Sequence, residues 1–212
     1  MSIICLEGAS AVGKTTTAEN LKAKYNAFVV PEVNLLFERP EGESAEWYFE
    51  RQIERFEIAR KQSETHRLVI LDGDPFQPLW YNWTYNFDGR QKLDFIERFY
   101  QSKIQNEMID FPDLYFIFSA NEKELRWRKD NDPSRRRSGF ERHLKIIEPQ
   151  RRYFRAMQNF SPNRVCFAEA EAVETNVNLV IDRVSALPKP DESKPRVLFE
   201  KMIQWLRENE AQ

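Results

Sequence analysis

Glycine is scarce in this chain: six of the 212 residues are glycine, where about 7% would be usual. Such a composition argues against a turn-rich all-β domain, because tight turns use residues that adopt positive φ. Gly8 and Gly13 lie close together near the N-terminus, and Gly73 follows an apolar run that ends in Asp72. A residue type used so sparingly indicates positions where the backbone requires it.

Cysteines and long apolar runs are also in short supply. Cys5 and Cys166 are the two cysteines, and each lies in an apolar stretch far from the other. This pattern argues against a disulfide framework and favours a reducing compartment. No apolar run approaches the roughly eighteen residues of a membrane helix, and no basic-then-apolar leader precedes the first predicted strand. We therefore expect a cytoplasmic protein with no membrane partner.

An excess of one charge sign is absent as well. The chain has 32 basic and 34 acidic residues and a net charge of −2, which excludes a global nucleic-acid-binding signature. A hydrophobic content of 41% with 13% aromatic residues excludes general disorder. The charges are unevenly distributed, however, because residues 126–155 contain eleven Lys or Arg and four Asp or Glu. This segment is expected to handle an anion other than nucleic acid.

Short apolar runs alternate with amphipathic segments and predict strands separated by helices. The predicted strands cover 3–6, 27–30, 68–71, 114–118 and 165–168; the predicted helices cover 14–25, 44–59 with Ser44 as its cap, 91–108, 140–157 with a kink or break at Pro149, and 173–184. These runs are too apolar for a one-sided sheet, so they predict an α/β fold with a parallel sheet covered on both faces. Residues 1–187 form the predicted domain, and 188–212 form a linker and a C-terminal helix packed on the core.

The N-terminal segment contains a phosphate-binding motif. Gly8, Gly13, Lys14 and Thr15 satisfy G-x-x-x-x-G-K-[ST], after a predicted strand and before a predicted helix. Glycine lets successive backbone N–H groups converge on phosphates, and the helix N-terminus adds a positive dipole. Lys14 is expected to reach the β- and γ-phosphates and Thr15 to bind Mg²⁺. The predicted ATP-binding residues are Gly8, Ala9, Ser10, Ala11, Val12, Gly13, Lys14, Thr15 and Thr16.

Further segments determine which branch of P-loop proteins the chain resembles. A GTPase would need Asn-Lys-x-Asp, and the nearest candidate at 121–124 has the wrong spacing. Over about 1–187 the chain resembles the nucleoside and nucleotide kinases, a group that includes deoxynucleoside, thymidylate and adenylate kinases. The segments that carry this resemblance are Pro31-Glu32, 47–52, Leu71-Asp72-Gly73-Asp74-Pro75 and Pro112-Asp113-Leu114. It implies a three-layer α/β/α fold with a five-stranded sheet in the order 2-3-1-4-5.

The sequence departs from this group at two places. Phe76 stands where an adenylate kinase would carry an arginine, and the segment around Asp74 lacks the arginine that deoxynucleoside kinases carry after the third strand.

The basic segment resembles the arginine-rich LID of these kinases, at about 126–142. Its arginines are expected to bind the ATP phosphates and to exclude water when the LID closes. Arg126 and Arg128 are the main candidates, joined by one of Arg135, Arg136 and Arg137, whereas Arg142 and Arg151 are expected to be surface or bracing residues. The alternative for this segment is a solvated, salt-bridged helix face or a nucleic-acid patch.

Three carboxylates are candidate catalytic groups. Asp72 and Glu32 follow predicted strands at the sheet edge where α/β proteins bind ligands, and Asp74 lies close to Asp72. Asp72 is expected to hold Mg²⁺ or to accept a proton, although Asp-Gly is also a turn signal. Glu32 is the natural general base if the acceptor is a hydroxyl. Which of the three is the base stays open.

The acceptor site is expected to contain Glu32, Arg51, Gln52, Asp74 and Phe76. Aromatic side chains that can stack on a planar acceptor ring gather in the same region, at Trp47, Tyr48, Phe76, Trp80, Tyr81 and Trp83. The two histidines, His66 and His143, lack metal-site spacing and are expected to be structural.

We therefore expect a kinase that uses ATP and Mg²⁺ to phosphorylate a hydroxyl of a small molecule, with a nucleoside-like acceptor in first place. An antibiotic or other metabolite hydroxyl and a nucleoside monophosphate remain open as acceptors. So do ATP or GTP as the donor, a homodimer, and a non-catalytic ATP-binding protein whose C-terminal helix binds a partner.

Overall fold

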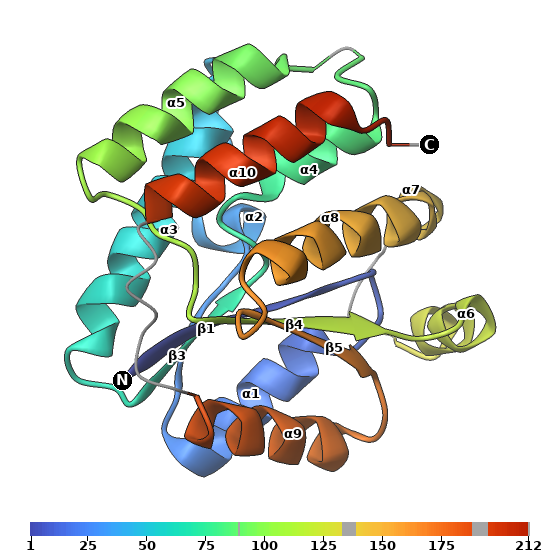
Figure 1. Cartoon of the computed structure of the whole chain (residues 1–212). Helices are drawn as coiled ribbons and strands as arrows, with labels where there is room; N and C mark the ends of the chain where they lie inside the picture. The colour runs from blue at the N-terminus through green and yellow to red at the C-terminus, as the bar shows by residue number, and fades with distance from the viewer. Residues whose placement is uncertain (89, 133–138, 188–194, 212) are drawn as a thin grey trace.

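The sheet is parallel throughout. The computed structural model describes residues 1–88, 90–132, 139–187 and 195–211 (Figure 1). Its strands are β1 (Ser2–Gly8), β2 (Phe28–Val30), β3 (Leu68–Asp72), β4 (Leu114–Ser119) and β5 (Val165–Glu169). They pair in the order β2-β3-β1-β4-β5. The predicted fold class and strand order are therefore confirmed.

Alternate residues of the strands enter two separate cores. Cys5, Val69 and Tyr115 belong to one hydrophobic cluster, while their neighbours Ile4 and Ile70 belong to the other. Successive side chains of a strand point to opposite faces, so a strand that is apolar at every position must be covered on both sides.

Helices cover both faces of the sheet unequally. α1 (Lys14–Tyr25) and α9 (Val173–Ser185) lie together on one face. The other face carries α3 (Trp47–Ser63), α4 (Gln77–Thr84), α5 (Leu93–Gln105) and α8 (Ile147–Phe160). α10 (Pro195–Glu208) packs against α5 and α8 and buries one apolar side (Figure 1). Three short helices complete the described chain: α2 (Val33–Leu36), α6 (Glu122–Asp130) and α7 (Phe140–Lys145).

Two helix boundaries differ from the sequence prediction. α3 begins at Trp47 and not after Ser44, and Glu46 precedes it without a side-chain cap. The basic region divides at Ile146, between α7 and α8, and not at Pro149. Pro149 lies in the first turn of α8, where its missing N–H would have no helical partner in any case.

Candidate active site

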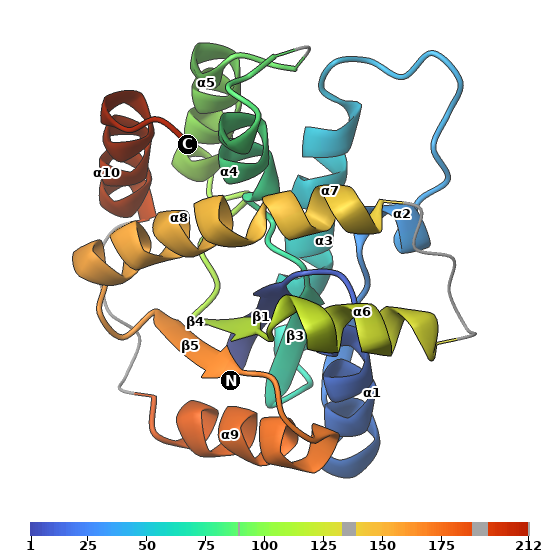
Figure 2. The same cartoon turned by 90° about the vertical axis from the view of Figure 1, so that its right-hand side faces the viewer.

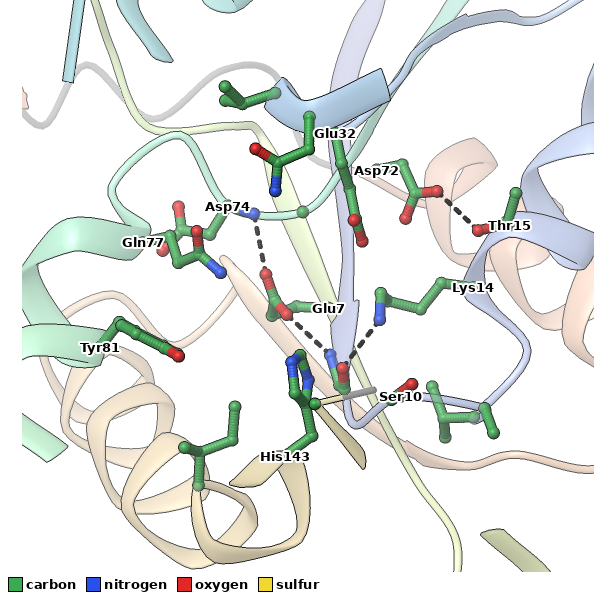
Figure 3. A pocket seen from close by; sticks show the side chains of 18 of the residues that line it. Glu7, Ser10, Lys14, Thr15, Glu32, Asp72, Asp74, Gln77, Tyr81 and His143 are labelled. Atoms are coloured by element: carbon green, nitrogen blue, oxygen red, sulfur yellow. Dashed lines mark hydrogen bonds between the residues drawn. The ribbon is translucent and has the colours of Figure 1, made fainter. Parts of the chain in front are cut away.

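A cavity of about 1650 Å³ lies at the carboxyl ends of β1, β2 and β3. Residues from the phosphate-binding loop, α3, α4, α6, α7 and the start of α9 line it. Figure 3 shows how polar side chains from the phosphate-binding loop, the ends of β2 and β3, α4 and α7 gather around the end of β1. Parallel α/β sheets bind ligands at this edge, so its position agrees with the expectation from sequence.

Two glycines shape the phosphate-binding loop. Gly8 has φ +138°, and a Cβ built on it would lie 2.3 Å from the Phe118 carbonyl oxygen. Gly13 has φ +105° and precedes the first turn of α1. Both positions therefore need glycine, the first for lack of space and the second for its backbone angle. The Lys14 ammonium donates to the carbonyl of Gly8 at 2.8 Å, which holds the cation inside the loop (Figure 3).

Thr15 and Asp72 meet at the floor of the cavity. The Thr15 hydroxyl donates to Asp72 Oδ2 at 2.8 Å (Figure 3). Asp72 is 2% exposed, and its buried Oδ1 has no hydrogen-bond partner. A buried carboxylate oxygen without a partner, next to a hydroxyl and at a phosphate-binding loop, fits a hydrated Mg²⁺, which takes oxygen ligands and shares them with phosphates. No group of three or more His, Cys, Asp or Glu residues suited to a metal occurs within the described ranges.

Glu32 lines the cavity at the end of β2, next to Gly73. A Cβ on Gly73 would lie 3.8 Å from Glu32 Cγ, so the two segments are in contact. The Glu32 carboxylate has no hydrogen bond or ion pair to any other residue in the part of the chain that the structure describes. It therefore retains its capacity to accept a proton or a ligand hydrogen bond.

Glu7 is a site residue that the sequence analysis missed. Its carboxylate accepts the backbone N–H groups of Gly8 at 3.0 Å and Asp74 at 2.8 Å, and the Gln150 amide at 3.1 Å. Burial raises the pKa of Glu7, although the nearby Lys14 lowers it. A charged residue at the end of an otherwise apolar strand was the available signal. Glu7 joins the phosphate-binding loop to the loop after β3.

Asp74 is a structural carboxylate in this arrangement. It is buried at the cavity wall, and its two oxygens accept hydrogen bonds from the Phe76 N–H, the Trp80 indole and the Tyr115 hydroxyl. Burial and the neighbouring Glu7 raise the pKa of Asp74 to about 7. Asp74 also lines the cavity, although its two oxygens accept hydrogen bonds from the core, so its expected catalytic and substrate-binding roles stay predictions.

Arg55, and not Arg51, is the arginine that α3 brings to the site. Arg55 is 1% exposed and donates to the carbonyls of Pro31, Asp72 and Gly73 and to the Gln52 amide oxygen. It thereby ties together the ends of β2 and β3. Gln52 lines the cavity as expected.

Arg51 lies outside the cavity lining, and this corrects its expected substrate-binding role. Its guanidinium forms an ion pair with Glu54 and lies over the Phe37 and Trp47 rings. Arg51 is one turn before Arg55, so the helix period does not separate the two. Gln52 and Arg55 are buried, whereas Arg51 is only partly buried and its guanidinium contacts Glu54, Phe37 and Trp47.

The aromatic candidates divide between cavity and core. Tyr48, Trp80 and Tyr81 line the cavity. Phe76 is fully buried and stacks on Phe111 with ring centroids 4.2 Å apart, so its expected contact with substrate is wrong. Trp47 and Trp83 are likewise absent from the described lining.

The basic segment is only partly described, because Arg135, Arg136 and Arg137 lie outside the described residues. Arg126 does not line the cavity; its guanidinium binds Glu122 and Glu141 on the outer side of α6. This contradicts its expected position at the phosphates.

Arg128 lines the cavity. It donates to the carbonyls of Val12 and Ala170, both at 3.0 Å, which braces the phosphate-binding loop. His143, which was expected to be structural, lines the cavity (Figure 3). Arg142, which was expected to be a surface or bracing residue, lines it as well.

Among the described residues, no helix is both long and apolar enough to cross a bilayer.

The fold is similar to three solved structures of deoxyadenosine kinase from M. mycoides. The structure with the products dCMP and dCDP has a TM-score of 0.55 and 17% identity, and the match covers 88% of this chain and 100% of that one. The structure with dATP has a TM-score of 0.55 and 15% identity, covering 87% and 100% of the two chains. The structure with dCTP has a TM-score of 0.54 and 18% identity, covering 87% and 99%.

These likenesses establish a shared P-loop kinase-like fold. No curated protein matches the sequence. Residues 3–160 match the model of the family described as AAA domain, and the chain belongs to that family.

Proposed function

We propose that this chain is an ATP- and Mg²⁺-dependent phosphotransferase that phosphorylates a hydroxyl group of a nucleoside-like small molecule. The observation that supports this proposal most directly is the carboxylate of Glu32. It lines the same cavity as Lys14, Thr15 and Asp72 and has no partner among the described side chains. A free carboxylate opposite a phosphate-binding loop is what a hydroxyl acceptor requires and a phosphate acceptor does not.

The donor triphosphate binds along Gly8–Thr16. Backbone N–H groups of the loop and the N-terminus of α1 bind the phosphates, and Lys14 exchanges its bond to the Gly8 carbonyl for bonds to phosphate oxygens. The Thr15 hydroxyl and Asp72 hold Mg²⁺, directly or through water. When bound, the ion neutralises charge on the phosphates. Arg128 stabilises the loop through its hydrogen bond to the Val12 carbonyl.

The acceptor binds between α3 and α4. Glu32 takes the proton of the acceptor hydroxyl as that oxygen attacks the γ-phosphorus. The bond from the γ-phosphorus to the β–γ bridging oxygen breaks, and ADP leaves. Gln52, Tyr48 and Gln77 supply polar groups, and Trp80 and Tyr81 supply rings. The deoxyadenosine kinase structures of similar fold contain nucleotides, which supports a nucleoside-like acceptor.

The decisive experiment measures ADP release from ATP and Mg²⁺ with a panel of nucleosides, nucleoside monophosphates and other hydroxylated metabolites. We expect a nucleoside to stimulate ADP release and to appear as its monophosphate in mass spectrometry. Phosphorylation of monophosphates alone would reject the hydroxyl acceptor and the role of Glu32. Tight ATP binding with no stimulation by any compound would favour a non-catalytic nucleotide-binding protein.

A further inference from the structure

Trp127 is an unusually exposed tryptophan. Its relative exposure is 61%, whereas Trp80 and Trp83 are at 1% and 2%. Single exposed apolar residues are common on protein surfaces, so exposure alone carries no function. The position of Trp127 is the informative feature, because its side chain lines the same cavity as Gly13 and Thr16 of the phosphate-binding loop.

One face of α6 is directed at this cavity. Glu124, Trp127, Arg128 and Asn131 line it, at the 3–4 spacing of a single helix face. Arg126 lies off this face and pairs with Glu122 and Glu141. Trp127 therefore lies on the face of α6 that borders the cavity, which also contains the phosphate-binding loop.

The backbone that carries Trp127 is fixed relative to the phosphate-binding loop. The neighbouring Arg128 donates to the carbonyls of Val12 and Ala170, and the Asn131 amide donates to the Trp127 carbonyl at 2.8 Å. Leu125, on the inner side of α6, is fully buried in the core. An aromatic ring held on a rigid element binds a planar ligand with little loss of backbone entropy.

The opposing wall comes from the connection between β5 and α9, which passes beneath α6 in Figure 2. Ala172 and Val173 line the cavity there, beside the polar residues Glu171 and Asn176. The Asn176 side chain bonds both the N–H and the carbonyl of Glu171 and so fixes the connection. An indole from α6 and small apolar side chains from this connection suit a flat aromatic ring better than a charged group.

We propose that Trp127 is the platform on which the purine base of the donor nucleotide stacks. This inference rests on the proposed binding of ATP along Gly8–Thr16. The indole contributes to affinity through the base alone, while the phosphate-binding loop holds the triphosphate. Stacking of a base on an aromatic side chain changes affinity by roughly fivefold or more.

The test compares Mg²⁺-ATP with Mg²⁺-tripolyphosphate, which has the phosphates and no base, by isothermal titration calorimetry. We expect Trp127→Ala to weaken ATP binding at least about fivefold and to leave tripolyphosphate binding within about twofold. Trp127→Phe, which keeps a ring, should fall between the wild type and Trp127→Ala. The matched control is Phe160→Ala, which removes another exposed ring (38%) outside the cavity lining and should leave both affinities unchanged.

Unchanged ATP affinity in Trp127→Ala would overturn the inference, as would an equal loss for both ligands, because the side chain would then act through α6 and not through the base. Failure of the wild type to bind ATP would instead overturn the proposed function, and this inference with it. ATP should also change the tryptophan fluorescence of the wild type, and that change should disappear in Trp127→Phe.

Discussion

The Glu7 carboxylate accepts the backbone N–H of Asp74 at 2.8 Å, and the Asp74 side chain is itself buried among three donors. Two carboxyl groups thus lie close together with little water around them. Burial raises the pKa of both groups, and the negative charge of Glu7 raises the pKa of Asp74 further.

This pair predicts a loss of stability as the pH rises. Asp74 has a pKa of about 7 in the folded protein against 3.8 when unperturbed, so the folded state binds more protons between these values. The free energy of unfolding should therefore fall from about pH 4 to pH 7, by an order of a few kcal/mol. Urea unfolding at pH 5 and pH 8 measures the difference. It should shrink in Asp74→Asn, and an undiminished difference would assign the effect to other groups.

Replacing the proposed base should affect chemistry and not donor binding. Glu32→Gln keeps the shape of the side chain and removes its capacity to accept a proton, so turnover with the best acceptor should fall by about 100-fold or more. The dissociation constant of ATP should stay within about twofold. Glu38→Gln, an exposed glutamate outside the cavity lining, is the control. Normal turnover in Glu32→Gln would transfer the role to Asp72 or Glu7.

Asp72 should control the response to Mg²⁺. In Asp72→Asn the buried oxygen next to Thr15 loses its charge, so we expect the Mg²⁺ concentration for half-maximal turnover to rise about tenfold or more. Asp182→Asn, an exposed change on α9, should leave the Mg²⁺ titration as in the wild type. A titration that is the same in Asp72→Asn and the wild type would contradict the proposed metal site.

Arg55 and Arg51 are one helical turn apart on α3 and should differ in importance. Arg55→Met leaves the buried carbonyls of Pro31, Asp72 and Gly73 without their donor and should lower the free energy of unfolding by about 3 kcal/mol. Arg51→Met removes a partly exposed ion pair and should cost less than about 1 kcal/mol. Equal costs in urea unfolding would show that Arg55 does not brace these strand ends.

Gly8 and Gly42 both have positive φ, but only Gly8 lacks space for a Cβ atom. A Cβ at Gly8 would collide with the Phe118 carbonyl oxygen, whereas a Cβ at Gly42 would meet nothing within 4 Å. Gly42→Ala should therefore cost only the strain of φ +69°, about 1 kcal/mol. Gly8→Ala should cost clearly more, about 2 kcal/mol or above, and should abolish ATP binding. Thermal unfolding with and without ATP measures both effects, and similar losses in the two variants would argue against the close approach at β4.

Features of this protein that depend on local patterns are predictable from the sequence. Apolar runs predict the five strands because a strand buried on both faces is apolar at every position. The phosphate-binding loop follows from a motif contained in residues 8–15.

Side-chain positions that depend on tertiary packing are not predictable from such patterns. Phe76 and Tyr81 are both aromatic and near α4, and only the tertiary structure places Phe76 in the core and Tyr81 at the cavity. Arg55 and Glu7 were missed because their partners lie at Pro31, Asp72, Asp74 and Gln150, in parts of the chain that no short pattern connects.

The central position of β1 has a consequence for the order in which the protein is synthesised. β1 leaves the ribosome before its hydrogen-bonding partners β3 and β4, which follow much later in the chain. At 5–20 residues per second, β4 is completed roughly 5 to 20 s after β1. During that interval an apolar strand with both edges unpaired is available to other chains, so the nascent protein depends on slow, late sheet assembly and on protection from aggregation.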